Sequence, residues 1–206
     1  MFGQDRNKAD SQETPIAADA LSRLMVNIAL DGDIYKLFFP SVAVGASKVF
    51  LDIWNGSTNL LMQIAHAVPI ADGSVAVAGT LGVNLFLTRT SDIGTGGTAA
   101  VAESTALTAT PAIARLDPRS PQCPATITAR AAPGGGATAG AVVGFNSQFS
   151  EETSIATYIR NDLLNIHGGY ASPLIVMPGT GIRIVQGSVA SVGNMAFEIL
   201  FSLRRQ

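Results

Sequence analysis

The sequence predicts a mainly β protein: an antiparallel β-sandwich or jelly roll with an N-terminal arm and one or two short helices. Apolar and polar residues alternate in several segments of strand length, and Gly, Asn, Asp and Pro separate these segments. No period of roughly 20–50 residues recurs, which argues against a solenoid or a propeller. About nine short strands joined by glycine-rich turns are typical of a two-sheet sandwich or a jelly roll.

The first 15 residues, MFGQDRNKADSQETP, are polar. They have almost nothing apolar to bury against a domain, and they lack the continuous apolar core of a signal peptide. Chain ends are usually mobile unless something holds them. We therefore expect residues 1–15 to form an extended arm that lies on a neighbouring subunit, with Met1 and Phe2 as candidate contact residues.

Residues 14–32 favour a helix. Thr14 suits the cap, Pro15 the first turn, and Gly32 the exit. Between them runs an apolar stripe at helical spacing, formed by Ala18, Leu21, Leu24, Met25 and Ile28. A strand beginning near Leu24 is the alternative.

Strands dominate from Lys36 onwards. Residues 48–54 and 59–68 are separated by the turn residues Asn55-Gly56-Ser57, as in a hairpin. A further strand lies within residues 74–90. Alternation within these segments predicts one apolar face made of Val49, Leu51 and Ile53, and another of Val83, Leu85 and Leu87.

Residues 91–140 are rich in Gly, Ala and Thr, with a strand-like segment at 125–131 between two such stretches. We interpret them as long loops that border one sandwich domain of residues 16–206. A split into two domains near residue 115 is the alternative.

The last third begins with the segment 141–150, AVVGFNSQFS, and a predicted short helix at 151–166, which Glu151 and Glu152 would favour at its N-terminus. Three strands follow, near 174–177, 181–186 and 195–203. In the last of them, Phe197, Ile199, Phe201 and Leu203 share one face. We expect this final strand to be the closing edge of the sandwich, with Arg204, Arg205 and Gln206 either protecting that edge or contacting an acidic neighbour.

The composition is apolar and weakly charged. Hydrophobic residues make up 47% of the chain, and charged residues only 14%, against roughly 25% charged in typical soluble domains. One interpretation is a compact β protein with Thr, Ser and Gly on its exposed faces. The other is that neighbouring subunits cover much of the surface, because interface cores are depleted of charge.

Charge and cysteine content disfavour several functional classes. The net charge is −2 and no basic run occurs beyond Arg204-Arg205, so we expect no nucleic-acid partner. No apolar run approaches the roughly 18 residues of a membrane-spanning helix, so we expect no membrane partner. The single Cys123 cannot form an intrachain disulfide, which fits assembly in a reducing cytosol.

No arrangement of residues points to catalysis, a cofactor or a metal. His66 and His167 lie far apart in sequence and have no ligand partner at a metal-binding spacing. His66 suits a core or an interface, and Cys123 lies in a proline-flanked loop that would not activate a thiol. We therefore predict that the protein is not an enzyme and that it binds no cofactor.

Two segments resemble structural proteins of tailed bacteriophages: residues 78–99, AGTLGVNLFLTRTSDIGTGGTA, and residues 178–203, PGTGIRIVQGSVASVGNMAFEILFSL. Accessory virion proteins of such phages often end with a PG.G turn, a VVQG-like strand and a final strand that carries FE. These features match Pro178-Gly179, Gly181, Val185-Gln186-Gly187 and Phe197-Glu198. The resemblance implies a non-enzymatic virion component, with no catalytic residues to carry over.

Two functional hypotheses follow. The first is a virion structural protein, such as a head decoration, head fibre or neck- or tail-associated subunit. It would form a homo-oligomer, a trimer or a ring, and would contact other virion proteins after assembly in the host cytoplasm. The alternative is a tail-tip or fibre module that binds host-surface glycans through exposed aromatic rings, for which Trp54, Tyr158 and Tyr170 are the candidates.

Overall fold

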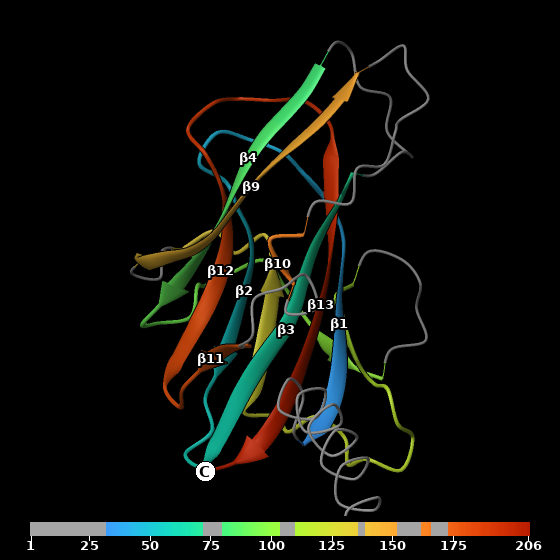
Figure 1. The fold of residues 1–206 in the computed structure, drawn as a ribbon. Coiled ribbons are helices and arrows are strands. Elements are labelled where there is room, and N and C mark those ends of the chain that lie inside the picture. Colours follow the sequence, from blue (N-terminus) through green and yellow to red (C-terminus); the bar gives the residue numbers. More distant parts are fainter. Residues whose placement is uncertain (1–31, 72–79, 104–109, 136–138, 152–161, 166–172) are drawn as a thin grey trace, which may run out of the picture.

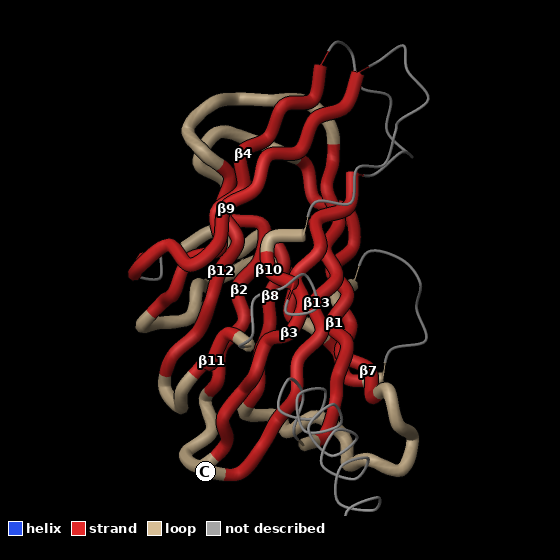
Figure 2. The backbone as a smooth tube through the Cα atoms, in the orientation of Figure 1, coloured by secondary structure: helices blue, strands red, loops and turns tan. Residues whose placement is uncertain are grey.

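The computed structural model describes residues 32–71, 80–103, 110–135, 139–151, 162–165 and 173–206. These residues form two β-sheets that pack face to face, and every regular element among them is a strand (Figures 1 and 2). This arrangement confirms the predicted antiparallel β-sandwich.

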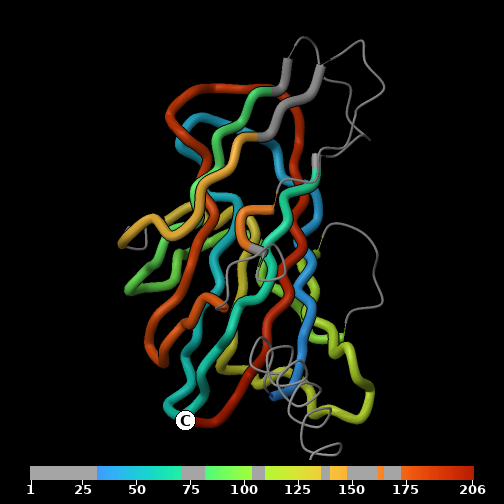
Figure 3. The backbone as a smooth tube through the Cα atoms, viewed as in Figure 1, coloured from blue at the N-terminus to red at the C-terminus, as the bar shows by residue number. Residues whose placement is uncertain are grey.

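The first sheet has seven strands in the order β10-β3-β13-β1-β7-β6, with β11 also paired to β3. Its strands are β1 (Asp33–Ala43), β3 (Leu60–Ala71), β6 (Val101–Ala102), β7 (Ala112–Arg115), β10 (Leu164–Asn165), β11 (Leu174–Val176) and β13 (Asn194–Arg205). All pairings are antiparallel except that of β6 with β7. The strands nearest the two ends of the described chain, β1 and β13, lie side by side (Figure 3).

The second sheet has six strands in the order β5-β8-β2-β12-β4-β9. Its strands are β2 (Val49–Asn55), β4 (Thr80–Thr90), β5 (Thr98–Ala99), β8 (Ile127–Ala131), β9 (Ala139–Glu151) and β12 (Thr180–Gln186). All of its pairings are antiparallel.

The core fills the space between the sheets with alternate residues of each strand. The first sheet contributes Tyr35, Leu37, Phe39, Met62, Ile64, Phe197, Ile199 and Phe201, and the second contributes Leu51, Ile53, Leu85, Leu87, Ile182 and Ile184, all fully or almost fully buried. The rings of Phe50 and Phe197 meet across the two sheets, with centroids 5.1 Å apart. Burial of this apolar area is the main force that holds the sheets together.

The predicted strands at 48–54, 59–68, 125–131 and in the C-terminal segment are confirmed. The segment 141–150, for which no element was predicted, lies within a strand, β9. The strand predicted within 74–90 is confirmed from Thr80 onwards, because residues 72–79 lie outside the described part. The alternation also holds: Val83, Leu85 and Leu87 face the core, as do Phe197, Ile199, Phe201 and Leu203.

The hairpin predicted around Asn55-Gly56-Ser57 is wrong. Strand β2 pairs with β8 and β12, whereas β3 pairs with β13, β10 and β11. The turn instead crosses from one sheet to the other. The buried Asn55 side chain fixes this crossing, because its Nδ2 donates to the carbonyl oxygens of Leu60 (2.8 Å) and Val176 (3.1 Å).

The predicted position of the last strand is also wrong. Strand β13 is not an edge; it lies between β3 and β1, near the middle of its sheet. Its outward-facing residues explain why an interior position suits it. Ser202 is fully buried and donates a hydrogen bond to Oε1 of the buried Gln63 on β3 (3.2 Å), and Ala196 is small and buried.

The predicted helices are not found in the described part of the chain. The helix at 14–32 and the arm at 1–15 fall almost entirely outside it. The prediction of a helix at 151–166 is wrong at both ends, because Glu151 ends β9 and Leu164–Asn165 forms β10, which pairs with His66 and Ala67 of β3. Residues 152–161 lie outside the described part.

Candidate functional site

The most unusual surface of the sandwich is the edge strand β9. The other strands at the sheet edges, β5, β6, β10 and β11, are two or three residues long, whereas β9 has 13 residues. Within the described part of the chain, β9 pairs only with β4, so its second edge has no strand partner. Figure 1 shows β4 and β9 running together along one side of the molecule.

Strand β9 is regular from Gly144 onwards. Its pairing with β4 shifts register near Val142 and Val143, then continues without a break from Gly144 opposite Leu87 to Glu151 opposite Thr80. Register shifts of this kind bend a strand and protect an edge. The straight part of the outer edge of β9 is therefore residues 144–151.

The outward face of this edge carries two exposed apolar side chains. The side chain of Phe145 is 57% exposed and that of Val142 is 56% exposed. The ring of Phe145 packs against that of Phe86 on β4, with centroids 5.2 Å apart. Next along the strand, the Ser147 hydroxyl donates to Oδ1 of Asn84 at 2.7 Å.

Charge is almost absent from β9. The strand has no Lys, Arg or Asp, and its one carboxylate is Glu151, the last residue. The only charged residue of β4 is Arg89, whose Nη1 donates to the carbonyl oxygen of Ile175 at 2.8 Å and is thereby held against the sandwich. Natural sheets commonly protect long edges with charged residues or proline, and β9 has neither before its final residue.

A buried ion pair lies on the outward face of the same sheet. Nε and Nη2 of Arg183 each donate to one oxygen of Asp52 at 2.9 Å, and both side chains are at most 5% exposed. The backbone N–H of Gly94 adds a third hydrogen bond to Asp52 at 2.9 Å. The pair is fully engaged and anchors the glycine-rich loop above it, so we assign it a structural role.

The loop over the ion pair requires glycine at position 94. A side chain there would collide with a carboxylate oxygen of Asp52 and with Pro133. The segment that contains Gly134 and Gly135 is bonded to this loop, because the N–H groups of both residues donate to the carbonyl oxygen of Thr95. Much of the glycine in the predicted loops therefore serves close packing on the sheet.

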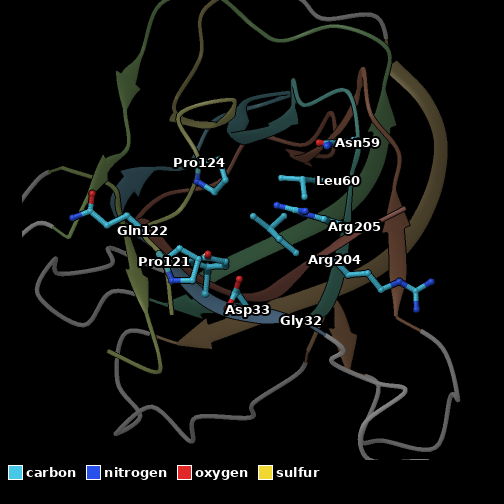
Figure 4. Close-up of a pocket in the computed structure, with 11 residues that line it drawn as sticks. Gly32, Asp33, Asn59, Leu60, Pro121, Gln122, Pro124, Arg204 and Arg205 are labelled. Atoms are coloured by element: carbon cyan, nitrogen blue, oxygen red, sulfur yellow. Dashed lines mark hydrogen bonds between the residues drawn. The ribbon is translucent and has the colours of Figure 1, made fainter. Parts of the chain in front are cut away.

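Two of the three predicted contact residues at the C-terminus, Arg204 and Arg205, line a hollow of about 500 Å³ (Figure 4). Arg204, Arg205 and Gln206 are exposed, and the Gln206 N–H donates to the carbonyl oxygen of Asn59 at 3.0 Å. In Figure 4, Arg205 lies beside Leu60 while Arg204 points away from the hollow. The opposite wall is held by Tyr35, whose hydroxyl donates to the carbonyl oxygen of Pro121 at 3.0 Å.

The remaining predicted site residues are not brought together. Met1, Phe2, Tyr158 and Tyr170 lie outside the described part of the chain. Trp54 is half-buried on the outward face of β2, with its ring against Gly181. The glycan hypothesis, which relies on Trp54, Tyr158 and Tyr170, stays a prediction.

The surroundings of His66 and Cys123, the titratable residues considered from the sequence, indicate structural roles. His66 is mostly buried, with Nε2 3.0 Å from Oδ2 of Asp162. Burial raises the pKa of the Cys123 thiol to about 12, so the thiol is protonated at neutral pH. Among the described residues, no three His, Cys, Asp or Glu side chains cluster as metal ligands would.

No family model matches the sequence, and the comparisons with curated proteins and with solved structures found no match either. The described residues include no helix long and apolar enough to cross a membrane.

Strand β9 was not among the predicted site residues, because the edge of the sandwich was expected at the C-terminus. A signal was present in the sequence. The segment 141–150, AVVGFNSQFS, contains no charged residue and no proline. An edge strand of this composition has nothing to prevent it from pairing with a strand of another chain.

Proposed function

We propose that the chain is a non-enzymatic structural subunit of a bacteriophage particle, which assembles through contacts of its β-sandwich with other chains. The observation that carries this proposal is the edge of β9. It is long, regular from residue 144, uncharged up to Glu151 and bordered by the exposed side chains of Val142 and Phe145.

The energetics of such an edge favour a partner. The backbone N–H and C=O groups of an edge strand are a template for another strand, and exposed apolar side chains beside them add to the gain from pairing. A soluble monomer with this edge would risk aggregation. In an assembly, the neighbouring chain covers the edge and the same features become stabilising.

The composition and the resemblance to phage proteins support a bacteriophage particle as the assembly. A charged fraction of 14% suits a subunit whose surface is largely covered. The segments 78–99 and 178–203 resemble accessory virion proteins of tailed phages, which supports a head decoration, a head fibre or a neck- or tail-associated subunit. The partners would be further copies of the chain and other virion proteins.

The direct test is the location of the protein in particles. Particles are purified from cells that carry the coding sequence, their proteins are identified by mass spectrometry, and a gold-labelled antibody locates the chain on intact particles. We expect a fixed number of copies at one place on the head, neck or tail. Particles that lack the protein, with all of it free in the lysate, would contradict the proposal.

A further inference from the structure

The exposed edge of β9 is nearly palindromic. The residues from Gly144 to Ser150 are GFNSQFS, which read outwards from Ser147 as an amide pair (Asn146, Gln148), an aromatic pair (Phe145, Phe149) and a small pair (Gly144, Ser150). All of these positions lie in the unbroken part of the register with β4.

A palindrome has a direct meaning at a two-fold axis. When two copies of one strand pair antiparallel about a central residue, each position meets the position equally far on the other side of the centre. With Ser147 at the centre, position 145 meets 149 and position 146 meets 148. Aromatic pairs and hydrogen-bonding pairs directly across a strand interface are the combinations that stabilise sheets.

We propose that β9 pairs antiparallel with β9 of a second copy, with Ser147 on the two-fold axis. This inference rests on the proposed function and names the partner at one of its contacts. The contact joins two six-stranded sheets into one continuous sheet. It adds about seven backbone hydrogen bonds over residues 144–150, at about one bond per residue in an antiparallel pair.

The electrostatics of the edge favour a second copy. Two copies of a strand that carries several charges of one sign would bring like charges close together, but β9 has no charge before Glu151. In the proposed register Glu151 lies opposite Val143. The two Glu151 residues are then separated by eight positions, about 26 Å along the strands, at a rise of about 3.3 Å per residue, which is beyond the screening length at physiological salt.

The geometry of the edge also selects the register. A slip by one residue would set phenylalanine opposite serine, and would exchange the two faces of the sheet. Centring the pair on Phe145 would bring residues 139–143 into the interface, where the register of β9 is irregular. Centring the pair on Gln148 would keep to the straight segment but would set Phe145 opposite Glu151 and Phe149 opposite Ser147, so only the arrangement centred on Ser147 both uses the straight segment and matches like residues.

Charge exchange at the two-fold axis tests the inference. The Ser147 side chain is exposed, so Ser147→Lys and Ser147→Glu should both fold, as thermal unfolding would show. In each variant alone, identical charges meet at the axis, and we expect the association constant to fall at least tenfold. In an equal mixture of the two variants, Lys meets Glu, and association should return to near the wild-type value.

The matched control is Thr128→Lys. Thr128 is exposed on the outward face of the same sheet, on β8 and well away from β9 in the strand order. It should leave association unchanged, as measured by sedimentation velocity over a range of concentrations. If Ser147→Lys associates as the wild type does, or if the mixture gives no recovery, the proposed pairing is overturned.

Cross-linking provides a second and independent measurement. In a Cys123→Ala background, Ser147→Cys should form a symmetric disulfide dimer on mild oxidation, because directly opposed residues have Cα atoms about 4.5–5.5 Å apart. Thr128→Cys in the same background should stay monomeric on a non-reducing gel. Equal cross-linking of the two variants would overturn the pairing.

The result separates this inference from the function on which it rests. If the chain assembles but the Ser147 variants neither weaken assembly nor cross-link, the β9 contact is wrong while the proposed function stands. If the wild-type chain does not associate with itself at all, the β9 contact is wrong, and the location of the protein in particles decides the proposed function separately.

Discussion

At the scale of single residues, the Asp52–Arg183 pair is the clearest case of chemistry used for structure. Its two side chains are at most 5% exposed and share two hydrogen bonds, with a third from Gly94 to Asp52. Removing one partner of a buried pair leaves the other charge without compensation, which typically costs about 3–5 kcal/mol. We therefore expect the pair to hold the loop that contains Gly94 against the outward face of this sheet.

We predict that Arg183→Met lowers the free energy of unfolding by about 3–5 kcal/mol. Guanidinium unfolding followed by fluorescence of Trp54, the only tryptophan, would measure the change. The matched control is Arg119→Met, because Arg119 forms an exposed pair with Asp117 and its loss should leave the midpoint nearly unchanged. Equal effects of the two substitutions would contradict the structural role of the buried pair.

Two other residues link stability to alkaline pH. Burial raises the pKa of Tyr35 from 10.0 to about 12 and that of Cys123 from 9.0 to about 12. The folded chain thus holds both protons more tightly than the unfolded chain does. Their contribution is fully present below about pH 9 and is lost as the pH rises towards 12.

We predict that the stability of the wild type falls between pH 9 and 12 and that Cys123→Ala makes this fall shallower, because the pKa difference at Cys123 spans this range. Urea unfolding at a series of pH values would measure the slope. An identical slope in both proteins would show that Cys123 does not contribute.

The Asn55-Gly56 sequence offers a chemical reporter of the fold. Such sequences deamidate when the backbone N of the glycine attacks the asparagine side-chain carbonyl, with release of ammonia. Here the Asn55 amide donates to two carbonyl oxygens, and the Gly56 N–H donates to the carbonyl oxygen of Thr126 at 2.9 Å. Both reacting groups are held in other contacts.

We predict that Asn55 stays intact in the folded protein and deamidates quickly in the urea-unfolded chain. Peptide mass spectrometry after incubation at mildly alkaline pH would detect the gain of mass at Asn55. The exposed Asn59, which is followed by leucine, gives an internal reference in the same digest. Deamidation of Asn55 at equal rates in the folded and unfolded chains would contradict the described turn.

At the scale of elements, residue patterns determined the strands better than they determined the strand neighbours. Residue patterns identified β2, β3, β4, β12 and β13 because one face of each must be buried. Which strands pair depends on long-range packing. The Asn55 turn therefore looked like a hairpin, although its side chain links Leu60 to Val176, 116 positions away in the sequence.

The loop of residues 91–97 illustrates a second limit. Its composition is that of a flexible linker, yet Gly94 is buried and lies directly against Asp52. Sequence alone does not distinguish a glycine that gives freedom from a glycine that permits close contact. The contact with Asp52 shows that Gly94 serves close packing in this loop.

We predict that Gly94→Ala loosens this loop, because the new methyl group would displace the Asp52 carboxylate and break its bond with the Gly94 N–H. Hydrogen exchange of the segment around residues 91–97 should rise, and the Tm should fall. Gly134→Ala is the control, since a methyl group there meets no atom within 4 Å. Unchanged exchange in Gly94→Ala would contradict the packing.

At the scale of the whole molecule, the fold class could be predicted from the sequence, while the candidate site could not. Low charge suggested covered surfaces, but it could not say which surface is covered. That required the strand order, which places β9 at an edge and β13 near the middle of its sheet. The predicted contact residues Arg204, Arg205 and Gln206 are exposed, and their role in assembly stays a prediction.

The central claim is that the protein acts through contacts between chains. Its most direct test is the mass of the full chain in solution, measured by light scattering or sedimentation from dilute to concentrated samples. We predict a defined oligomer whose population rises with concentration, dissociates on dilution and weakens when a charge is placed on the β9 edge. A chain that remains a monomer at the highest soluble concentration would contradict the claim.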